Sequence, residues 1–194
     1  MIRWALWLLG GLLLGGIVHL GSVLLLPRTA TQDAFTRLSA SAPANSMVPM
    51  PAATPDEAVL PFMDPAFATS VCRYDLADGP LTLRVPVSQA YTSVSFYTRN
   101  EVAYYAINDR SAGRRVIELD LMTEAQHNAL PEDEEVTAAD RLIIDSPTST
   151  GLIVMKALAA EPGLMAQAQA SLAAANCSTQ TEPPSKAEAP RGRR

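Results

Sequence analysis

Residues 4–26 form an apolar run that contains no Asp, Glu, Lys or Arg. An α-helix rises ~1.5 Å per residue, so such a run reaches roughly 34 Å, slightly more than the ~30 Å hydrocarbon core of a bilayer. This length and composition are typical of a membrane-spanning helix. We therefore predict that residues 4–26 contact the lipid bilayer as a single-pass anchor and that the rest of the chain is tethered to it.

A cleaved signal peptide is the alternative for this segment. The hydrophobic region of a signal peptide is usually about 7–15 residues long and precedes an A-x-A-like site, whereas this run is longer and ends in three leucines before Pro27. Length favours a retained anchor. The flanking charges Arg3 and Arg28 do not fix its orientation. Because nearly all polar residues follow the run, we expect a cytoplasmic N-terminus and a domain outside the cytoplasm.

Within the run, Gly11 and Gly15 have the small-xxx-small spacing that lets two membrane helices pack closely. The alternative is that glycine is simply frequent in membrane helices. His19 also has two interpretations: a functional intramembrane group, or a neutral imidazole near the outer interface.

The charge balance argues against nucleic-acid binding, since the formal net charge is −5 and such binding requires clustered Lys and Arg. Residues 178–194 are polar and basic, so we predict a disordered tail, either solvated or touching anionic lipid headgroups. We divide the rest into the anchor 4–26, a juxtamembrane helix and proline-rich connector 27–61, and one β-rich extracytoplasmic domain 62–177.

Local patterns assign the elements. We predict a juxtamembrane helix at residues 29–38 with Thr31 as N-cap, and an extended connector at 40–61 that partly forms an edge strand. Asp64-Pro65 is a helix start, and the apolar spacing that follows predicts a helix continuing through Tyr74.

β-like runs follow, and the short connections between them predict antiparallel neighbours. Thr123 and Gln126 fit a capping box that begins a short helix. Residues 141–146 and 151–157 fit a hairpin, and a final helix is expected at 162–176. Together these elements predict an α+β fold: a transmembrane helix, then one antiparallel β-rich domain with a few short helices and a C-terminal helix. The first β-like runs are residues 81–87, 91–98, 102–107 and 115–121.

The chain has two cysteines, Cys72 on the predicted helix after Asp64 and Cys177 at the end of the last helix. Both positions suit a bond that staples a terminal element to the domain. An even, small number of cysteines beyond a membrane anchor fits an oxidising compartment. We predict a disulfide, with two free thiols as the alternative.

Catalytic and metal-binding patterns are absent from the sequence. Only His19 and His127 are present, and the cysteines lack C-x-x-C spacing. There is no nucleophile elbow, phosphate loop or dinucleotide motif. Residues 132–135 are acidic, but a solvated loop explains them better than a Ca²⁺ site. We therefore predict no catalytic residues, no metal and no cofactor.

Polar side chains near strand ends form the one candidate ligand site. Arginine can hold a carboxylate bidentately and tyrosine can orient a ligand through its hydroxyl. The structural alternative is that these arginines form salt bridges and these tyrosines supply core area. The candidate ligand-binding residues are Arg73, Arg99, Tyr104 and Tyr105.

Three segments give the chain a recognisable character: DPAFATSVCRYDL at 64–76, YTSVSFY at 91–97 and ALAAEP at 157–162. With these segments the chain resembles small single-span proteins of the Domain of Unknown Function family 1254. The resemblance implies a bacterial inner-membrane protein with a β-rich domain. Larger relatives join a similar domain to one of family 1214, so it also implies an envelope partner carrying that second domain. It assigns no catalytic residues.

Two functions fit these observations. The first is a membrane-anchored, non-catalytic extracytoplasmic module that binds an envelope protein. The second is a small-ligand binder or enzyme that uses the arginines and tyrosines above. The anchor, the proline-rich connector and the missing catalytic motifs favour the first.

Overall fold

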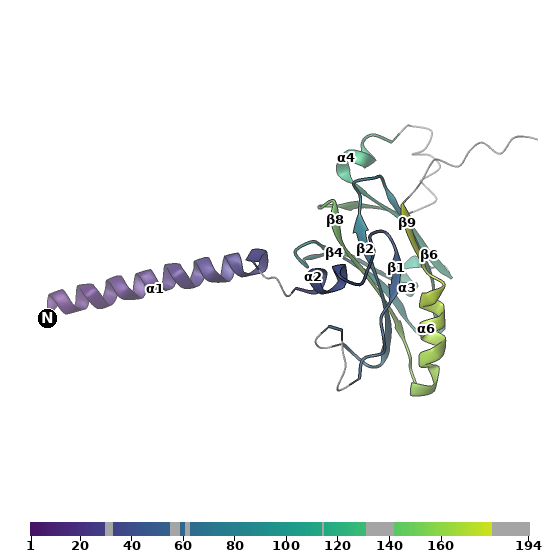
Figure 1. The fold of residues 1–194 in the computed structure, drawn as a ribbon, viewed down its shortest axis with the longest axis horizontal. Helices are drawn as coiled ribbons and strands as arrows, with labels where there is room; N and C mark the ends of the chain where they lie inside the picture. The colour runs from purple at the N-terminus through teal and green to yellow at the C-terminus, as the bar shows by residue number, and fades with distance from the viewer. Residues whose placement is uncertain (30–32, 55–58, 61–62, 114, 131–141, 180–194) are drawn as a thin grey trace, which may run out of the picture.

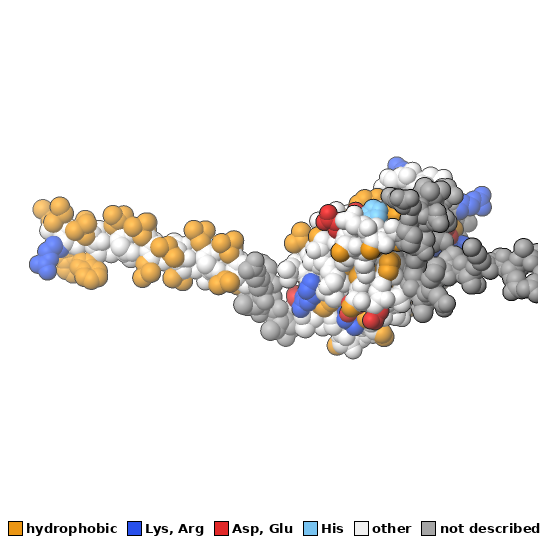
Figure 2. Space-filling view, turned by 90° about the horizontal axis from the view of Figure 1, so that it is seen from above, with side chains coloured by type: hydrophobic (Ala, Val, Ile, Leu, Met, Phe, Trp, Pro, Cys, Tyr) orange, Lys and Arg blue, Asp and Glu red, His pale blue; other side chains and the backbone are white. Residues whose placement is uncertain are grey.

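The computed structural model describes residues 1–29, 33–54, 59–60, 63–113, 115–130 and 142–179. Helix α1 spans Ile2–Thr29 and stands apart from the β-rich domain (Figure 1). Within it, Ile2–Leu26 is the one described segment long and apolar enough to cross a membrane, with a hydropathy of 2.1. Its large hydrophobic side chains are exposed from Ile2 to Leu26 and follow one another along the face seen in Figure 2, as expected for a lipid-facing helix. The predicted apolar helix is confirmed.

In the described residues, nine strands form two sheets, which pack beside each other (Figure 1). Sheet A has five strands in the order β1-β2-β8-β4-β5, and sheet B has four in the order β7-β6-β3-β9. All pairs are antiparallel except β6 and β7, which run parallel. The strands of sheet A are β1 (Met47–Pro49), β2 (Phe67–Asp75), β8 (Thr150–Leu158), β4 (Thr92–Thr98) and β5 (Ala103–Asn108). Those of sheet B are β7 (Leu142–Ser146), β6 (Val116–Thr123), β3 (Leu81–Pro86) and β9 (Asn176–Thr179).

The main core lies between the two sheets. Along β4 every second residue from Thr92 to Thr98 is buried, as the alternation predicts, and Ile117, Leu119 and Leu121 face it from β6. The 3₁₀ turn Pro162–Leu164 and helix α6 (Met165–Ala173) close this core through Ala168 and Leu172. The predicted α+β class is confirmed.

A second, smaller core lies on the other face of sheet A. Helix α2 (Ala34–Ser39) packs Phe35 and Leu38 against Val71 and Leu152 of the sheet. Its N-cap is Asp33, whose side chain accepts a hydrogen bond from the Thr36 amide, so the assignment of Thr31 as N-cap is wrong. β1 is an edge strand paired with β2, which confirms the predicted edge strand in the connector.

The helix predicted from Asp64 through Tyr74 is wrong, because these residues form the long strand β2. Asp64 does make a local turn, accepting a hydrogen bond from the Ala66 amide at 2.9 Å. From Phe67 onward, however, the chain pairs with β8 over nine residues. Helical spacing of the aromatic residues is overridden by this pairing, which buries Cys72 and Tyr74 in the core.

The predicted hairpin of residues 141–146 and 151–157 is also wrong, since β7 lies in sheet B and β8 in sheet A. Sequential antiparallel pairing holds for β4 with β5 but not for β3 with β4, which occupy different sheets.

The capping box of Thr123 and Gln126 is confirmed at the start of α4 (Glu124–His127). A further short helix, α3 (Asp109–Ala112), follows β5.

The last helix ends at Ala173, earlier than predicted, because Asn176–Thr179 forms β9 beside β3. This strand carries Cys177, which is bonded to Cys72 with a Cα–Cα distance of 6.5 Å. The predicted disulfide is therefore confirmed, and it joins β2 of sheet A to β9 of sheet B. The predicted acidic loop 132–135 and residues 180–194 of the predicted tail lie outside the described residues, and the four-part division of the chain remains a prediction.

Candidate functional site

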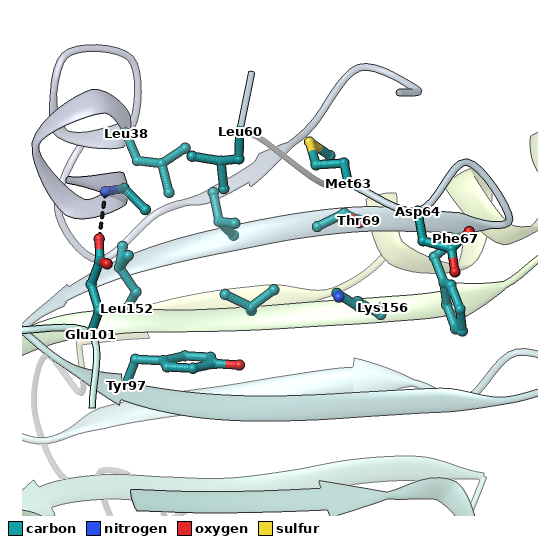
Figure 3. Close-up of a pocket in the computed structure, with 13 residues that line it drawn as sticks. Leu38, Leu60, Met63, Asp64, Phe67, Thr69, Tyr97, Glu101, Leu152 and Lys156 are labelled. Carbon is teal, nitrogen blue, oxygen red and sulfur yellow. Dashed lines mark hydrogen bonds between the residues drawn. The ribbon is translucent and has the colours of Figure 1, made fainter. Parts of the chain in front are cut away.

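A groove of about 320 Å³ lies on the outer face of sheet A (Figure 3). Its floor is formed by β2, β8 and Tyr97 of β4, and its walls by α2, Leu60, Met63 and Asp64. This volume is at the lower end of the range typical of small-molecule sites. The lining residues are Ala34, Leu38, Leu60, Met63, Asp64, Phe67, Thr69, Val71, Tyr97, Glu101, Leu152, Val154 and Lys156.

Strand alternation explains why these residues share one face. In β8, Leu152, Val154 and Lys156 are two residues apart and point away from the main core. The register places Val71 beside Val154 and Thr69 beside Lys156 on the neighbouring strand β2. An apolar row and a polar row therefore follow one another along the floor.

The two ends of the groove carry opposite charges. Leu38, Leu152 and the carboxylate of Glu101 lie at one end, whereas Lys156, Asp64 and Phe67 lie toward the other end (Figure 3). Among the described residues that line the groove, the only cation, Lys156, is at this second end. Lys156 is exposed, and within the described part of the chain it has no hydrogen-bond or ion-pair partner. The groove thus presents one available cation beside an apolar surface.

Glu101 fixes the position of α2 over the floor. It lies in the turn between β4 and β5, with the left-handed φ of 61°. Its carboxylate accepts hydrogen bonds from the amides of Ala34 and of Phe35, the latter at 3.3 Å. Since these amides begin a helix, a carboxylate is a favourable partner for them.

Arg99, a predicted ligand-binding residue, makes structural contacts with the same helix. Its guanidinium pairs with Asp33 at 2.9 Å and lies 4.1 Å from the centre of the Phe35 ring. Partial burial acts to raise the pKa of Asp33, but hydrogen bonds from Thr36 and Arg99 outweigh it and hold the pKa below 3.8. Arg99 and Glu101 together clamp α2 to the β4–β5 hairpin.

Arg73 and the two predicted tyrosines lie elsewhere. Arg73 is on β2, and its Nε donates to the carbonyl of Ala42 at 3.1 Å, which fastens the connector to the sheet. Tyr105 lies on β5 with its ring centre 5.9 Å from that of Phe96. Tyr104 donates from its hydroxyl to the Tyr74 hydroxyl at 3.3 Å, and burial raises its pKa.

None of Arg73, Arg99, Tyr104 and Tyr105 lines the groove, and the structure does not bring the four into one pocket. Their assignment as ligand-binding residues stays a prediction. Sequence reasoning missed Lys156, although the outward alternation of residues 152, 154 and 156 was available as a signal.

Strand β5, which carries Tyr104 and Tyr105, is an edge of sheet A. Its sequence, AYYAIN, contains no charge and no proline, although proteins usually protect an exposed edge with such residues. Ala103 and Ala106 are exposed on it. In the described part of the chain, β5 is an edge on which a further strand could pair.

Over the described ranges, no three His, Cys, Asp or Glu side chains converge as metal ligands. His127 pairs with Asp145 through Nδ1 at 2.8 Å, on the exposed side of α4 and β7. The absence of a metal or cofactor remains a prediction, as does the packing role of Gly11 and Gly15, neither of which has a described neighbour close to the position of a Cβ.

The domain is a two-layer β-sandwich with a groove on the outer face of one sheet, and an apolar helix precedes it in the chain. The chain belongs to the family described as "Protein of unknown function (DUF1254)", which matches residues 44–178. This confirms the family indicated by the sequence.

Two solved structures are similar to the domain. The VPA0106 protein from Vibrio parahaemolyticus has a TM-score of 0.56 at 13% identity, over 75% of this chain and 32% of that one. A putative uncharacterized protein from Burkholderia cenocepacia has a TM-score of 0.44 at 16% identity, over 71% of this chain and 34% of that one. The chain thus spans about a third of the length of either protein. A comparison with curated proteins finds no match.

Proposed function

We propose that this chain is a non-catalytic binding module of the bacterial inner membrane, with a cytoplasmic N-terminus and a periplasmic sandwich domain that docks a second envelope protein. The apolar helix supports the membrane anchor. The Cys72–Cys177 bond supports an oxidising compartment, because cytosolic proteins rarely keep disulfides.

The observation that carries the proposal is the unprotected edge of β5. An extended partner segment can add to such an edge through main-chain hydrogen bonds, while side-chain pockets provide selectivity. The partner we propose carries a domain of family 1214. The solved Vibrio protein supports a second component, because the region similar to this chain makes up 32% of it.

Charge placed on the edge tests this docking mode. Ala106→Lys introduces an exposed cation on β5, and Ala125→Lys introduces one on the exposed surface of α4 as a matched control. The full chain is placed in lipid nanodiscs and titrated with a purified family 1214 protein from the same bacterium. The proposal predicts binding that Ala106→Lys weakens about tenfold, because a lysine on a sheet edge disfavours pairing with a further strand, and that Ala125→Lys leaves unchanged.

If both variants bind the partner equally well, the interface does not lie on β5. Absence of binding by the unsubstituted chain would contradict the proposed partner. In either case the two substitutions lie outside the groove, so the groove can be tested separately.

A further inference from the structure

We propose that the groove on the outer face of sheet A binds a single-chain anionic amphiphile, a fatty-acid-type carboxylate drawn from the adjacent membrane leaflet, with Lys156 as its counter-ion. This site is separate from the β5 edge and does not depend on protein docking there. It does depend on the membrane anchor.

The floor and one wall of the groove suit an alkyl chain. Leu38, Val71 and Leu152 form a base that is already packed, since they are 1%, 0% and 3% exposed. The apolar area open to a ligand comes from the half-buried side chains of Leu60 and Val154 above this base. A chain laid along this surface removes apolar area from water on both sides, which is the main favourable term for binding a lipid-like ligand.

Lys156 supplies the charge for the headgroup. It follows Leu152 and Val154 on the same face of β8, and its amine nitrogen points along the floor toward the middle of the groove (Figure 3). The Thr69 hydroxyl, one strand away at the same register, adds a hydrogen-bonding group. A carboxylate bound here would gain a charge-assisted hydrogen bond while its tail contacts the apolar floor.

Two acidic residues also line the groove, and they affect an anion differently. Glu101 is hydrogen-bonded to the amides at the start of α2, which compensates its charge locally. Asp64 is exposed on the wall, and its carboxylate accepts a local hydrogen bond from the Ala66 amide. Asp64 therefore weakens anion binding without blocking it, and its neutralisation should strengthen binding.

The length of chain between the anchor and the groove places the site near the membrane. Helix α1 ends at Thr29, and α2, which forms a groove wall, begins at Ala34. Four residues lie between them, so the two ends are five Cα steps, or at most about 18 Å, apart when fully extended. A lipid leaving the leaflet therefore has the groove within about its own length, which favours a membrane-derived amphiphile over a water-soluble ligand.

Photocrosslinking tests the proposal on the full chain. The protein is reconstituted in phosphatidylcholine vesicles with palmitate bearing a diazirine in its tail, or with the uncharged alcohol of the same chain. Crosslinked peptides are then mapped by mass spectrometry. We expect the carboxylate probe to label α2 and β8, and the alcohol to label them about tenfold less, as expected for loss of a charged hydrogen bond.

Substitutions identify the counter-ion. Lys156→Gln should lower groove labelling by the carboxylate about tenfold and leave labelling by the alcohol unchanged. Lys156→Arg should retain labelling by the carboxylate. Asp64→Asn should raise labelling by the carboxylate about twofold, the size of a surface charge effect. Arg110→Gln on α3, an exposed cation outside the groove, is the matched control.

Each variant is checked for an intact disulfide by its mobility on a non-reducing gel. Labelling confined to α1 would overturn the proposal. Labelling of α2 and β8 that is equal for the two probes, or unchanged by Lys156→Gln in the folded protein, would overturn the role of Lys156 and with it the anionic class of the ligand.

Discussion

The two faces of sheet A differ sharply in composition and burial. The inner face of β8 presents Gly151, Ile153, Met155 and Ala157 to the core, and all four are buried. The outer face presents Leu152, Val154 and Lys156, of which the first is buried, the second half-buried and the third exposed. One strand thus contributes to a closed core on one side and to an open groove on the other. The comparison indicates that stability resides mainly between the sheets and that binding chemistry resides on the outer face.

The disulfide gives the largest expected effect because it joins the two layers of the inner core. Its cysteines are 105 residues apart, and opening a loop of that size costs up to about 5 kcal/mol in the chain-entropy model. The Cys72→Ser, Cys177→Ser double variant should therefore unfold at much lower urea concentration, as measured by circular dichroism of the full chain in detergent micelles. Reduction of the unsubstituted protein should produce the same shift, and an unchanged midpoint would contradict a stabilising bond.

Neighbouring residues on β8 compare the two faces directly. Ile153→Ala should lower the free energy of unfolding by about 4 kcal/mol, because the tightly packed inner core cannot close around the cavity. Leu152→Ala should cost about 2 kcal/mol, since α2 can settle onto the groove floor. Urea unfolding of both variants measures the difference. An equal or larger cost for Leu152→Ala would show that the outer face is packed as tightly as the inner one.

Gly151 tests how closely the inner face is packed. A Cβ at this position would lie 2.2 Å from the carbonyl oxygen of Tyr97 and 2.4 Å from the hydroxyl of Tyr74. Gly151→Ala should therefore destabilise the domain by about 2 kcal/mol through overpacking. Gly163→Ala is the control, because nothing lies within 4 Å of its Cβ position. Similar thermal unfolding of both variants would refute the close approach.

The clamp on α2 should have the smallest effect and depends on pH. The folded-state pKa of Asp33 lies below 3.8, so its contribution to stability is present above that value and is lost as pH falls through the lowered pKa. Arg99→Gln should cost about 0.5–1 kcal/mol at neutral pH, because the Arg99 side chain is 40% exposed. Amide hydrogen exchange of α2 should rise in this variant. Exchange that is unaltered by the substitution would show that Glu101 alone holds the helix.

Local patterns predicted the elements that depend on local contacts. The alternation in β4 and the capping box of Thr123 were evident from neighbouring residues alone. β2 was misassigned because Asp64-Pro65 is a true turn signal, whereas the strand that follows is stabilised by pairing with the distant strand β8. Sequence order likewise gave no indication that β7 and β8 would enter different sheets.

The candidate site was harder to predict than the fold for the same reason. The groove exists because α2, which follows the apolar helix α1 in the chain, packs over a sheet face whose centre is β8, far along the chain. Arg99 looked like a ligand contact in the sequence, but its partners Asp33 and Phe35 come from that distant helix. Lys156 attracted no attention because a single lysine in a strand has no distinctive local pattern.

The central claim is that the sandwich domain lies on the oxidising side of a bacterial inner membrane. Labelling with an impermeant maleimide, in cells with a permeabilised outer membrane and in opened membranes, tests it most directly. Because Cys72 and Cys177 are 0% and 3% exposed in the folded domain, labelling is done in urea. The account predicts that the two cysteines then react in those cells only after reduction, and that the single Cys→Ser variants react in urea without reduction. Thiols that are free without reduction, shielded in cells and reactive only in opened membranes would place the domain in the cytoplasm and contradict the account.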